Sequence, residues 1–312
     1  MHKASIQSYN LNMRYYLQIF IVIFLGIIIS CVKTPISNKS AFILIPINQE
    51  VALGKQAFKQ ILKNEKYSNN KIVSDLVKTI GFRIAKISAM PNLDWEFKLI
   101  ESKEQNAFAL PGGKVAVYTG LIPIAMNEAG LATVMSHEIA HVIARHGAQR
   151  MTQQLILSAG LLATSISLNN SRQKKMIMAA LGVGIAYGFT LPFSRSNEAE
   201  ADQIGLRYMA KAGYDPNEAT RFWKRFSDVK GGEKVPDFLS THPADRRRIA
   251  LIKKYLTRAK IDYSSLKVKY GLGKTLKLMD SESHYDKNHS IPKSPKAIPG
   301  VSVETLIQMK AK

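Results

Sequence analysis

Apolar residues recur at helical spacing along much of this chain. Amphipathic helices are predicted over Asn48 to Asn64 and over Lys71 to Ser88. In the second range the apolar side chains follow one another one, three or four positions apart, at Val73, Leu76, Val77, Ile80 and Ile84. Leu131 to Ala144 is another apolar, helix-like run. These stretches predict a mainly helical protein.

Three short stretches have the pattern of β-strands. Trp95 to Ile100 alternates between the two faces of a strand. Asn106 to Leu110 and Val115 to Tyr118 are two further short strands, on either side of Pro111-Gly112-Gly113. The fold class predicted from these patterns is α+β, mainly helical, with one small sheet.

Start and stop signals predict three more helices. Ser194 is a good N-cap, and Gly213 is a good left-handed cap at the other end. Asp215-Pro216-Asn217-Glu218 is a capping box with proline at the first helical position. Pro243 opens the third helix. The expected extents are 194–212, 215–226 and 243–256.

Two apolar stretches, Leu155 to Leu168 and Met176 to Phe189, are joined by a polar link and predict a helical hairpin. Each arm is too short to span a bilayer comfortably. Two interpretations remain open. The arms are core helices, or they form a flap over a site and touch membrane or apolar substrate.

The candidate chemistry begins at His137-Glu138-Ile139-Ala140-His141, an H-E-x-x-H sequence inside the apolar run. A helix has 3.6 residues per turn, so His137 and His141 lie one turn apart on one face. Two imidazoles placed in this way can bind one zinc ion. Glu138 can reach a water at that zinc and act as a general base.

A catalytic zinc ion needs a third protein ligand and an open position. Glu198 and Asp202 lie four positions apart on one face of the predicted helix, and Gly205 on that face lets a second helix approach closely. Glu198 therefore suits the third ligand, and Asp202 suits the acceptor of a ligand histidine's free N–H. Glu200 points to a different face and is not expected to bind the metal. Taken alone, these acids would indicate only a solvated helix start.

The H-E-x-x-H sequence followed by Glu198 and Asp202 resembles the pattern of the gluzincin metalloendopeptidases that include HtpX, the CAAX prenyl proteases and the periplasmic enzymes BepA and LoiP. Two further stretches are similar to that family. Asn106 to Gly113 resembles the segment that leads to its active-site strand. Ser240-Thr241-His242-Pro243 resembles a late motif whose histidine approaches the zinc in some members. The resemblance covers roughly Pro46 to Leu256.

This resemblance implies a zincin-like fold with a small sheet beside the H-E-x-x-H helix, one Zn²⁺ per chain, and hydrolysis of peptide bonds. It gives His242 a catalytic role, either as a donor to the oxyanion or as a group that blocks the zinc until substrate arrives. The alternative for His242 is a histidine that caps the next helix. His146 has the spacing of a family histidine, and no role is assigned to it.

The first thirty residues resemble a lipoprotein signal peptide. An apolar run from Ile19 to Ser30 is long enough for a signal sequence and short for a membrane span. It ends in Ile28-Ile29-Ser30-Cys31, which resembles a bacterial lipobox and predicts that Cys31 carries lipid. The alternative is an uncleaved signal anchor. Val32 is not the aspartate that retains lipoproteins in the inner membrane of enteric-type bacteria, which favours the outer membrane.

The formal net charge of +21 suggests an acidic partner. Nucleic acid is not expected, because an exported protein seldom meets it and the chain has no nucleic-acid-binding motif. Anionic membrane surface and a lysine-rich background composition both remain as explanations. The single cysteine excludes an internal disulfide.

The sequence therefore predicts a zinc metalloendopeptidase, lipid-anchored on the periplasmic face of a bacterial envelope, which hydrolyses misfolded or misassembled envelope proteins. The alternative is a non-catalytic lipoprotein that serves as a chaperone or assembly factor, which would not need Glu138. The predicted organisation is a signal peptide (1–30), a tether (31–45), the peptidase domain (46–258) and a basic, loosely ordered extension (259–312).

Overall fold

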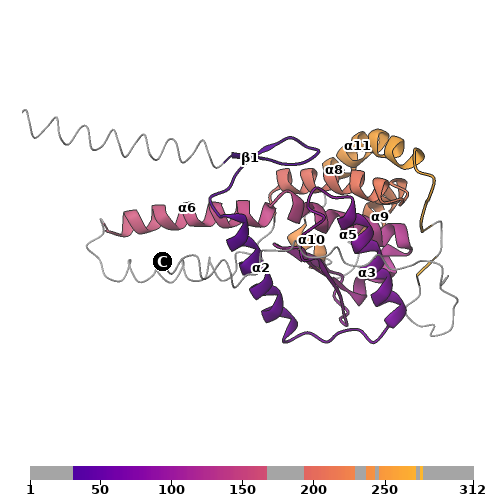
Figure 1. The fold of residues 1–312 in the computed structure, drawn as a ribbon, viewed down its shortest axis with the longest axis horizontal. Helices are drawn as coiled ribbons and strands as arrows, with labels where there is room; N and C mark the ends of the chain where they lie inside the picture. Colours follow the sequence, from indigo (N-terminus) through magenta and orange to yellow (C-terminus); the bar gives the residue numbers. More distant parts are fainter. Residues whose placement is uncertain (1–30, 167–192, 229–236, 243–245, 272–274, 277–312) are drawn as a thin grey trace, which may run out of the picture.

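Helix α5 (Glu128–Ile143) runs through the middle of the structure, and all 16 of its residues are buried. The structure is a computed structural model that describes residues 31–166, 193–228, 237–242, 246–271 and 275–276 (Figure 1). The side chain of Asn127 caps α5 by accepting a hydrogen bond from the backbone N–H of Gly130 at 2.8 Å. A helix buried on every side explains why its sequence is apolar almost all round.

The sheet contains the three predicted strands, β3 (Glu96–Ile100), β4 (Ala107–Leu110) and β5 (Lys114–Tyr118). Their order is β3-β5-β4, with β3 parallel and β4 antiparallel to β5. Gly112 and Gly113 turn the chain from β4 into β5, both at a φ of 80° that disfavours other residues. The strand order makes β5 the central strand and β4 an edge strand of this sheet.

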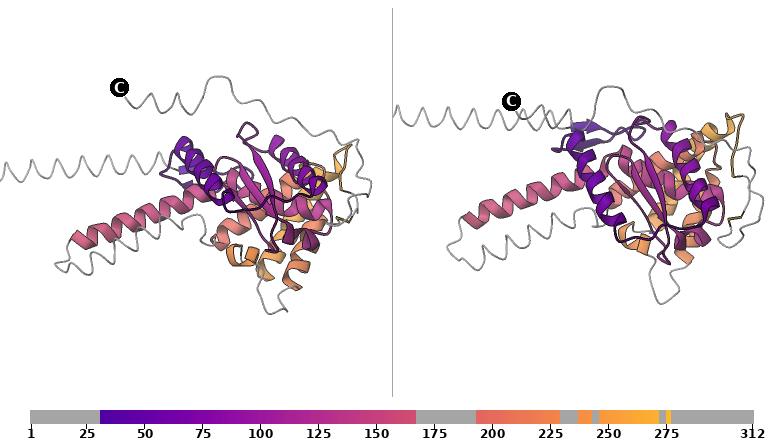
Figure 2. Two further views of the ribbon diagram at one scale, coloured as in Figure 1. Left: turned by 90° about the horizontal axis from the view of Figure 1, so that it is seen from below. Right: turned by 60° about the horizontal axis from the view of Figure 1, so that its bottom comes forward.

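Helices surround this sheet, which confirms the mainly helical α+β class. The sheet lies between α2 and α3, as the two views of Figure 2 show. Helix α6 extends away from the body. The helical elements other than α5 are α2 (Ile47–Leu62), α3 (Lys71–Lys86), the short η1 (Thr119–Leu121), α4 (Ile122–Ala125), α6 (His146–Ile166), α8 (Arg195–Lys211), α9 (Asn217–Asp228), α10 (Asp237–Thr241) and α11 (Arg246–Ser264).

Helices α5 and α8 pack closely at Gly205. A Cβ atom added there would lie 2.9 Å from the carbonyl carbon and oxygen of Ser136 and 3.0 Å from the backbone nitrogen of His137. This confirms the predicted close approach of a second helix. Helix α8 begins at its predicted cap, because the Ser194 hydroxyl accepts from the N–H of Asn197 at 3.1 Å. Gly213, at a φ of 91°, follows its end.

Two local predictions differ from the structure. Helix α6 begins at His146, nine positions before the expected Leu155, directly after a left-handed Arg145 with a φ of 54°. The second predicted arm, Met176 to Phe189, lies outside the described residues. Helix α11 continues to Ser264, past its expected end near Leu256. No helix in the described ranges is both long and apolar enough to cross a membrane.

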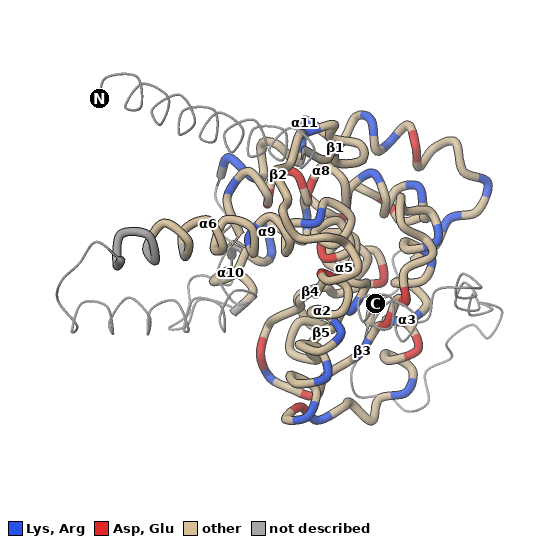
Figure 3. Tube along the Cα trace, turned by 60° about the vertical axis from the view of Figure 1, so that its left-hand side comes forward, with Lys and Arg blue, Asp and Glu red and all other residues tan. Residues whose placement is uncertain are grey.

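The segment expected to be a tether contains an antiparallel hairpin, β1 (Cys31–Lys33) with β2 (Ser40–Phe42). It docks on the body because Ala41 and Ile43 pack against Ala148 of α6. The beginning of the expected loose extension docks too, since the N–H of Tyr270 donates to the Gly213 carbonyl at 2.8 Å. Basic and acidic positions are spread over many elements of the body (Figure 3).

Candidate metal centre

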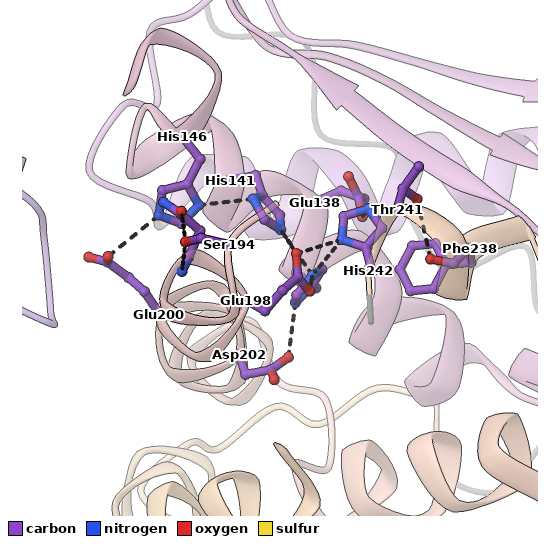
Figure 4. A network of polar contacts seen from close by, with 12 residues as sticks. Glu138, His141, His146, Ser194, Glu198, Glu200, Asp202, Phe238, Thr241 and His242 are labelled. Atoms are coloured by element: carbon purple, nitrogen blue, oxygen red, sulfur yellow. Dashed lines mark hydrogen bonds and ion pairs between the residues drawn. The ribbon is translucent and has the colours of Figure 1, made fainter. Parts of the chain in front are cut away.

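Two neighbouring helices and one short turn bring four candidate ligands together. Helix α5 contributes His137 and His141, α8 contributes Glu198, and His242 follows the end of α10. Figure 4 shows His141, Glu198 and His242 pointing toward one another. One ligand atom from each of the four lies within 4.8 Å of all the others. All four residues are buried. The structure therefore places together the three ligands predicted from the sequence and adds His242 to them.

The facing atoms are nitrogens and carboxylate oxygens. His137 Nε2 lies 3.0 Å from His141 Nε2 and 3.3 Å from Glu198 Oε2. Glu198 Oε1 lies 3.4 Å from His141 Nε2 and 3.0 Å from His242 Nδ1. Imidazole nitrogens and carboxylate oxygens are both common protein ligands of zinc. The donor set therefore fits a zinc ion.

Asp202 lies behind His137, one of the candidate ligands. Its Oδ1 is 3.0 Å from Nδ1 of His137. The same carboxylate accepts from Arg248 of α11, at 2.6 Å from Nε and 2.9 Å from Nη2. Arg248 Nη1 also reaches Glu198 Oε2 at 2.9 Å. Sequence reasoning missed Arg248, whose only signal was a run of three arginines shortly after His242.

His146 and Glu200 lie behind the other histidine, and neither was predicted to do so. His146 Nδ1 is 2.9 Å from His141 Nδ1, and His146 Nε2 is 3.5 Å from Glu200 Oε2. Glu200 faces away from the four candidate ligands, as its position two residues after Glu198 predicts. The spacing of His146 was visible in the sequence, but its contact depends on the break in the helix at Arg145.

The electrostatics of the site favour a bound cation. Burial and Arg248 lower the pKa of His137, but the carboxylates of Asp202 and Glu198 outweigh them and raise it to about 9. Burial raises the pKa of Glu198, but His242, Arg248 and His137 outweigh it and hold that pKa well below its ordinary value. Burial holds the pKa of His141 well below its ordinary value, which keeps that imidazole neutral and able to bind a metal.

Glu138 lies beside the candidate ligands without belonging to them. It is 1% exposed, and its Oε1 accepts no hydrogen bond from the described residues, although His242 Nε2 is 3.4 Å away. A buried carboxylate oxygen normally has a hydrogen-bond donor, so this atom suits a water molecule at the metal. Burial raises the pKa of Glu138, which His242 and His137 partly offset.

A buried H-E-x-x-H helix packed against a second helix that supplies a glutamate is the architecture of a zinc metallopeptidase. The chain belongs to peptidase family M48, whose model matches residues 73–256. It is accordingly a zinc-dependent metalloendopeptidase, which confirms the predicted enzyme class and cofactor. The narrower grouping with HtpX, the CAAX prenyl proteases, BepA and LoiP remains a prediction.

This chain is similar to mitochondrial metalloendopeptidases and to beta-barrel assembly-enhancing proteases. It is 35% identical to the mitochondrial metalloendopeptidase OMA1 of Schizosaccharomyces pombe over 73% of this chain and 67% of the relative. The corresponding protein of Saccharomyces cerevisiae is 31% identical over 73% of this chain and 69% of its own length. The beta-barrel assembly-enhancing protease of Escherichia coli is 30% identical over 69% of this chain but only 45% of its own length.

Proposed function

We propose that this chain cleaves misfolded or misassembled proteins of a bacterial envelope, with His137, His141 and Glu198 holding one zinc ion and Glu138 serving as general base. The observation that carries this proposal is the position of Glu138. Its Oε1 lies 3.4 Å from Nε2 of His242, one of the four candidate ligands, and accepts no hydrogen bond from the described residues.

Each residue has a distinct part in peptide hydrolysis. When bound, zinc acts as a Lewis acid and lowers the pKa of a water toward neutrality. Glu138 takes a proton from the attacking water and passes it to the leaving amine. Asp202 accepts the N–H of His137 Nδ1, which leaves Nε2 with a lone pair for the metal.

His242 occupies the place where substrate must enter. It belongs to the group of four ligand atoms, and a four-coordinate zinc held by all four would have no open position. Cleavage therefore requires His242 to move away from Glu198. His242 directly follows the five-residue helix α10, so we propose that this helix moves with it. The displaced imidazole then donates a hydrogen bond to the developing oxyanion.

Strand β4 is the place for an extended substrate. Strand β5, which contains Val115 to Tyr118, is paired on both sides and has no free edge for a substrate. Strand β4 pairs only with β5 among the described strands, and Ala109 and Leu110 lie near His141 and Phe193 around a space of only about 10 Å³. Pairing through the backbone makes few demands on sequence, which suits unfolded substrates.

The lipid anchor and the domain boundaries stay part of this proposal. A lipidated Cys31 stands at the start of β1 and would place the hairpin at a membrane surface. The names of the relatives point to two settings, one mitochondrial and one connected with β-barrel assembly. The lipobox-like sequence favours the periplasmic face of a bacterial envelope, and Val32 after Cys31 favours the outer membrane. Palmitate labelling and mass spectrometry of the mature N-terminus test this. Cys31→Ser should abolish the label, and an unmodified Cys31 would contradict the anchor.

The catalytic proposal is tested against the non-catalytic alternative by Glu138→Gln. The amide has nearly the same shape but cannot accept the proton, so casein cleavage should fall by on the order of 10²–10⁴ while zinc content stays at that of the unmodified protein. A chaperone or assembly factor would show no cleavage to lose. Undiminished cleavage by zinc-loaded Glu138→Gln protein would remove Glu138 from its role as base.

A further inference from the structure

The two histidines on α5 have different partners at Nδ1. His137 Nδ1 faces a carboxylate directly, Asp202 Oδ1 at 3.0 Å. His141 Nδ1 faces the imidazole of His146, whose Nδ1 is 2.9 Å away. The carboxylate on this side, Glu200, stands one step further out and contacts His146 Nε2 at 3.5 Å.

The protons in this chain of contacts can be placed without conflict. His141 presents Nε2 to the other candidate ligands, so its proton is on Nδ1 and is donated to Nδ1 of His146. His146 then carries its own proton on Nε2 and donates it to Glu200. Each nitrogen has one role, donor or acceptor. His146 is neutral in this arrangement, which agrees with its 1% exposure.

Glu200 is held from its other side by the turn between β1 and β2. The hydroxyls of Thr34 and Ser37 both donate to Glu200 Oε1. Lys39 Nζ lies 3.6 Å from Oε2. Thr34 and Glu200 are each 4% exposed, so the hairpin closes over the carboxylate. A buried carboxylate with three donors and a nearby ammonium is fixed in orientation.

We propose that His146 and Glu200 are positioning residues for His141, and that the turn of the N-terminal hairpin, residues 34–39, completes this support. The hairpin thereby sets the affinity of the site for its metal. The inference rests on the proposed ligand set, in which His141 binds the zinc. It connects the segment next to the predicted lipid anchor to the candidate metal centre indirectly, through Glu200 and His146.

The test is the zinc dissociation constant, measured on the full chain in detergent by competition with a chromophoric chelator. His146→Ala leaves the N–H of His141 without an acceptor and should raise the constant roughly 10–100-fold. Thr34→Val, which lacks the hydroxyl, should raise it by about 3–10-fold, because Ser37 and Lys39 remain. Thr34→Ser keeps the hydroxyl and should restore affinity to within about twofold. The visible spectrum of the cobalt-substituted protein should change in the same order, since it reports ligand geometry.

Glu218→Gln is the matched control for a purely structural effect. Glu218 is a buried carboxylate of α9 that pairs with Arg221 and Arg225 and touches none of the candidate ligands. Its variant should lower thermal stability and leave the zinc constant unchanged. Wild-type affinity in a folded His146→Ala protein, or equal affinities for Thr34→Val and Thr34→Ser, would overturn the inference. Full zinc binding by His141→Ala would instead show that the proposed ligand set is wrong.

Discussion

The two histidines of the metal centre are supported by different parts of the molecule. His137 is backed by Asp202 and Arg248, which belong to α8 and α11 in the packed helical body. His141 is backed by His146, at the first turn of α6, and through Glu200 by a two-stranded hairpin. The residues behind His137 cannot change without disturbing the core. The support of His141 extends to the N-terminal hairpin at the edge of the body. Changes in that hairpin should alter the metal affinity with a smaller loss of folding stability.

The largest effect is expected where both supports meet, at Glu198. Glu198→Ala removes the carboxylate that faces all three imidazoles, and the purified protein should contain no stoichiometric zinc. Glu200→Ala is the matched variant two positions along α8. It should still bind one zinc per chain at saturating metal, with weaker affinity. Metal analysis of both purified variants measures the difference in zinc content. Equal loss of zinc from the two would show that Glu198 is not the specific ligand from α8.

A smaller effect is expected from Asp202→Asn, on the His137 side. It removes the charge that both His137 and Arg248 face, so zinc affinity should fall roughly 10–100-fold. Asp262→Asn breaks a comparable pair between α8 and α11, in which Asp262 contacts Arg207 away from the metal. That control should lower the melting temperature alone. The two variants are compared by chelator competition and thermal melting. A loss of affinity in both would show that helix packing, not the contact with His137, is responsible.

The smallest effect concerns the spacing of the helices. Gly205→Ala puts a methyl group 2.9 Å from the backbone of Ser136, so α5 and α8 must separate. Overpacking of this kind costs about 1–3 kcal/mol of unfolding free energy. Gly160→Ala, where an added Cβ has none of the described atoms within 4 Å, should stabilise its helix by up to about 1 kcal/mol. Chemical denaturation of both variants provides the comparison, and equal stability of the two would contradict close packing at Gly205.

The difference between the two supports also explains what the sequence could predict. Helical periodicity was enough to place Glu198, Asp202 and Gly205 on one face of one helix. The three strands and most helices were predicted for the same reason, since each depends on local patterns. On the His137 side of the site these local signals were sufficient for Asp202, but not for Arg248.

The His141 side could not be predicted from local signals. His146 reaches His141 only because Arg145 adopts a left-handed conformation that separates α5 from α6. Thr34 and Glu200 are 166 positions apart, and a short polar segment after an apolar leader gave no sign of docking. Arg248 was likewise hidden among neighbouring arginines. Each of these contacts depends on tertiary packing, which periodicity does not describe.

The most direct test of the central claim is an anomalous diffraction map collected at the zinc absorption edge from crystals of Glu138→Gln protein. We expect one zinc peak per chain, bound by Nε2 of His137, Nε2 of His141 and a carboxylate oxygen of Glu198. Asp202 should contact Nδ1 of the first histidine, and His146 should contact Nδ1 of the second. A zinc peak elsewhere in the chain, or one whose ligands omit Glu198 or either histidine, would contradict the account.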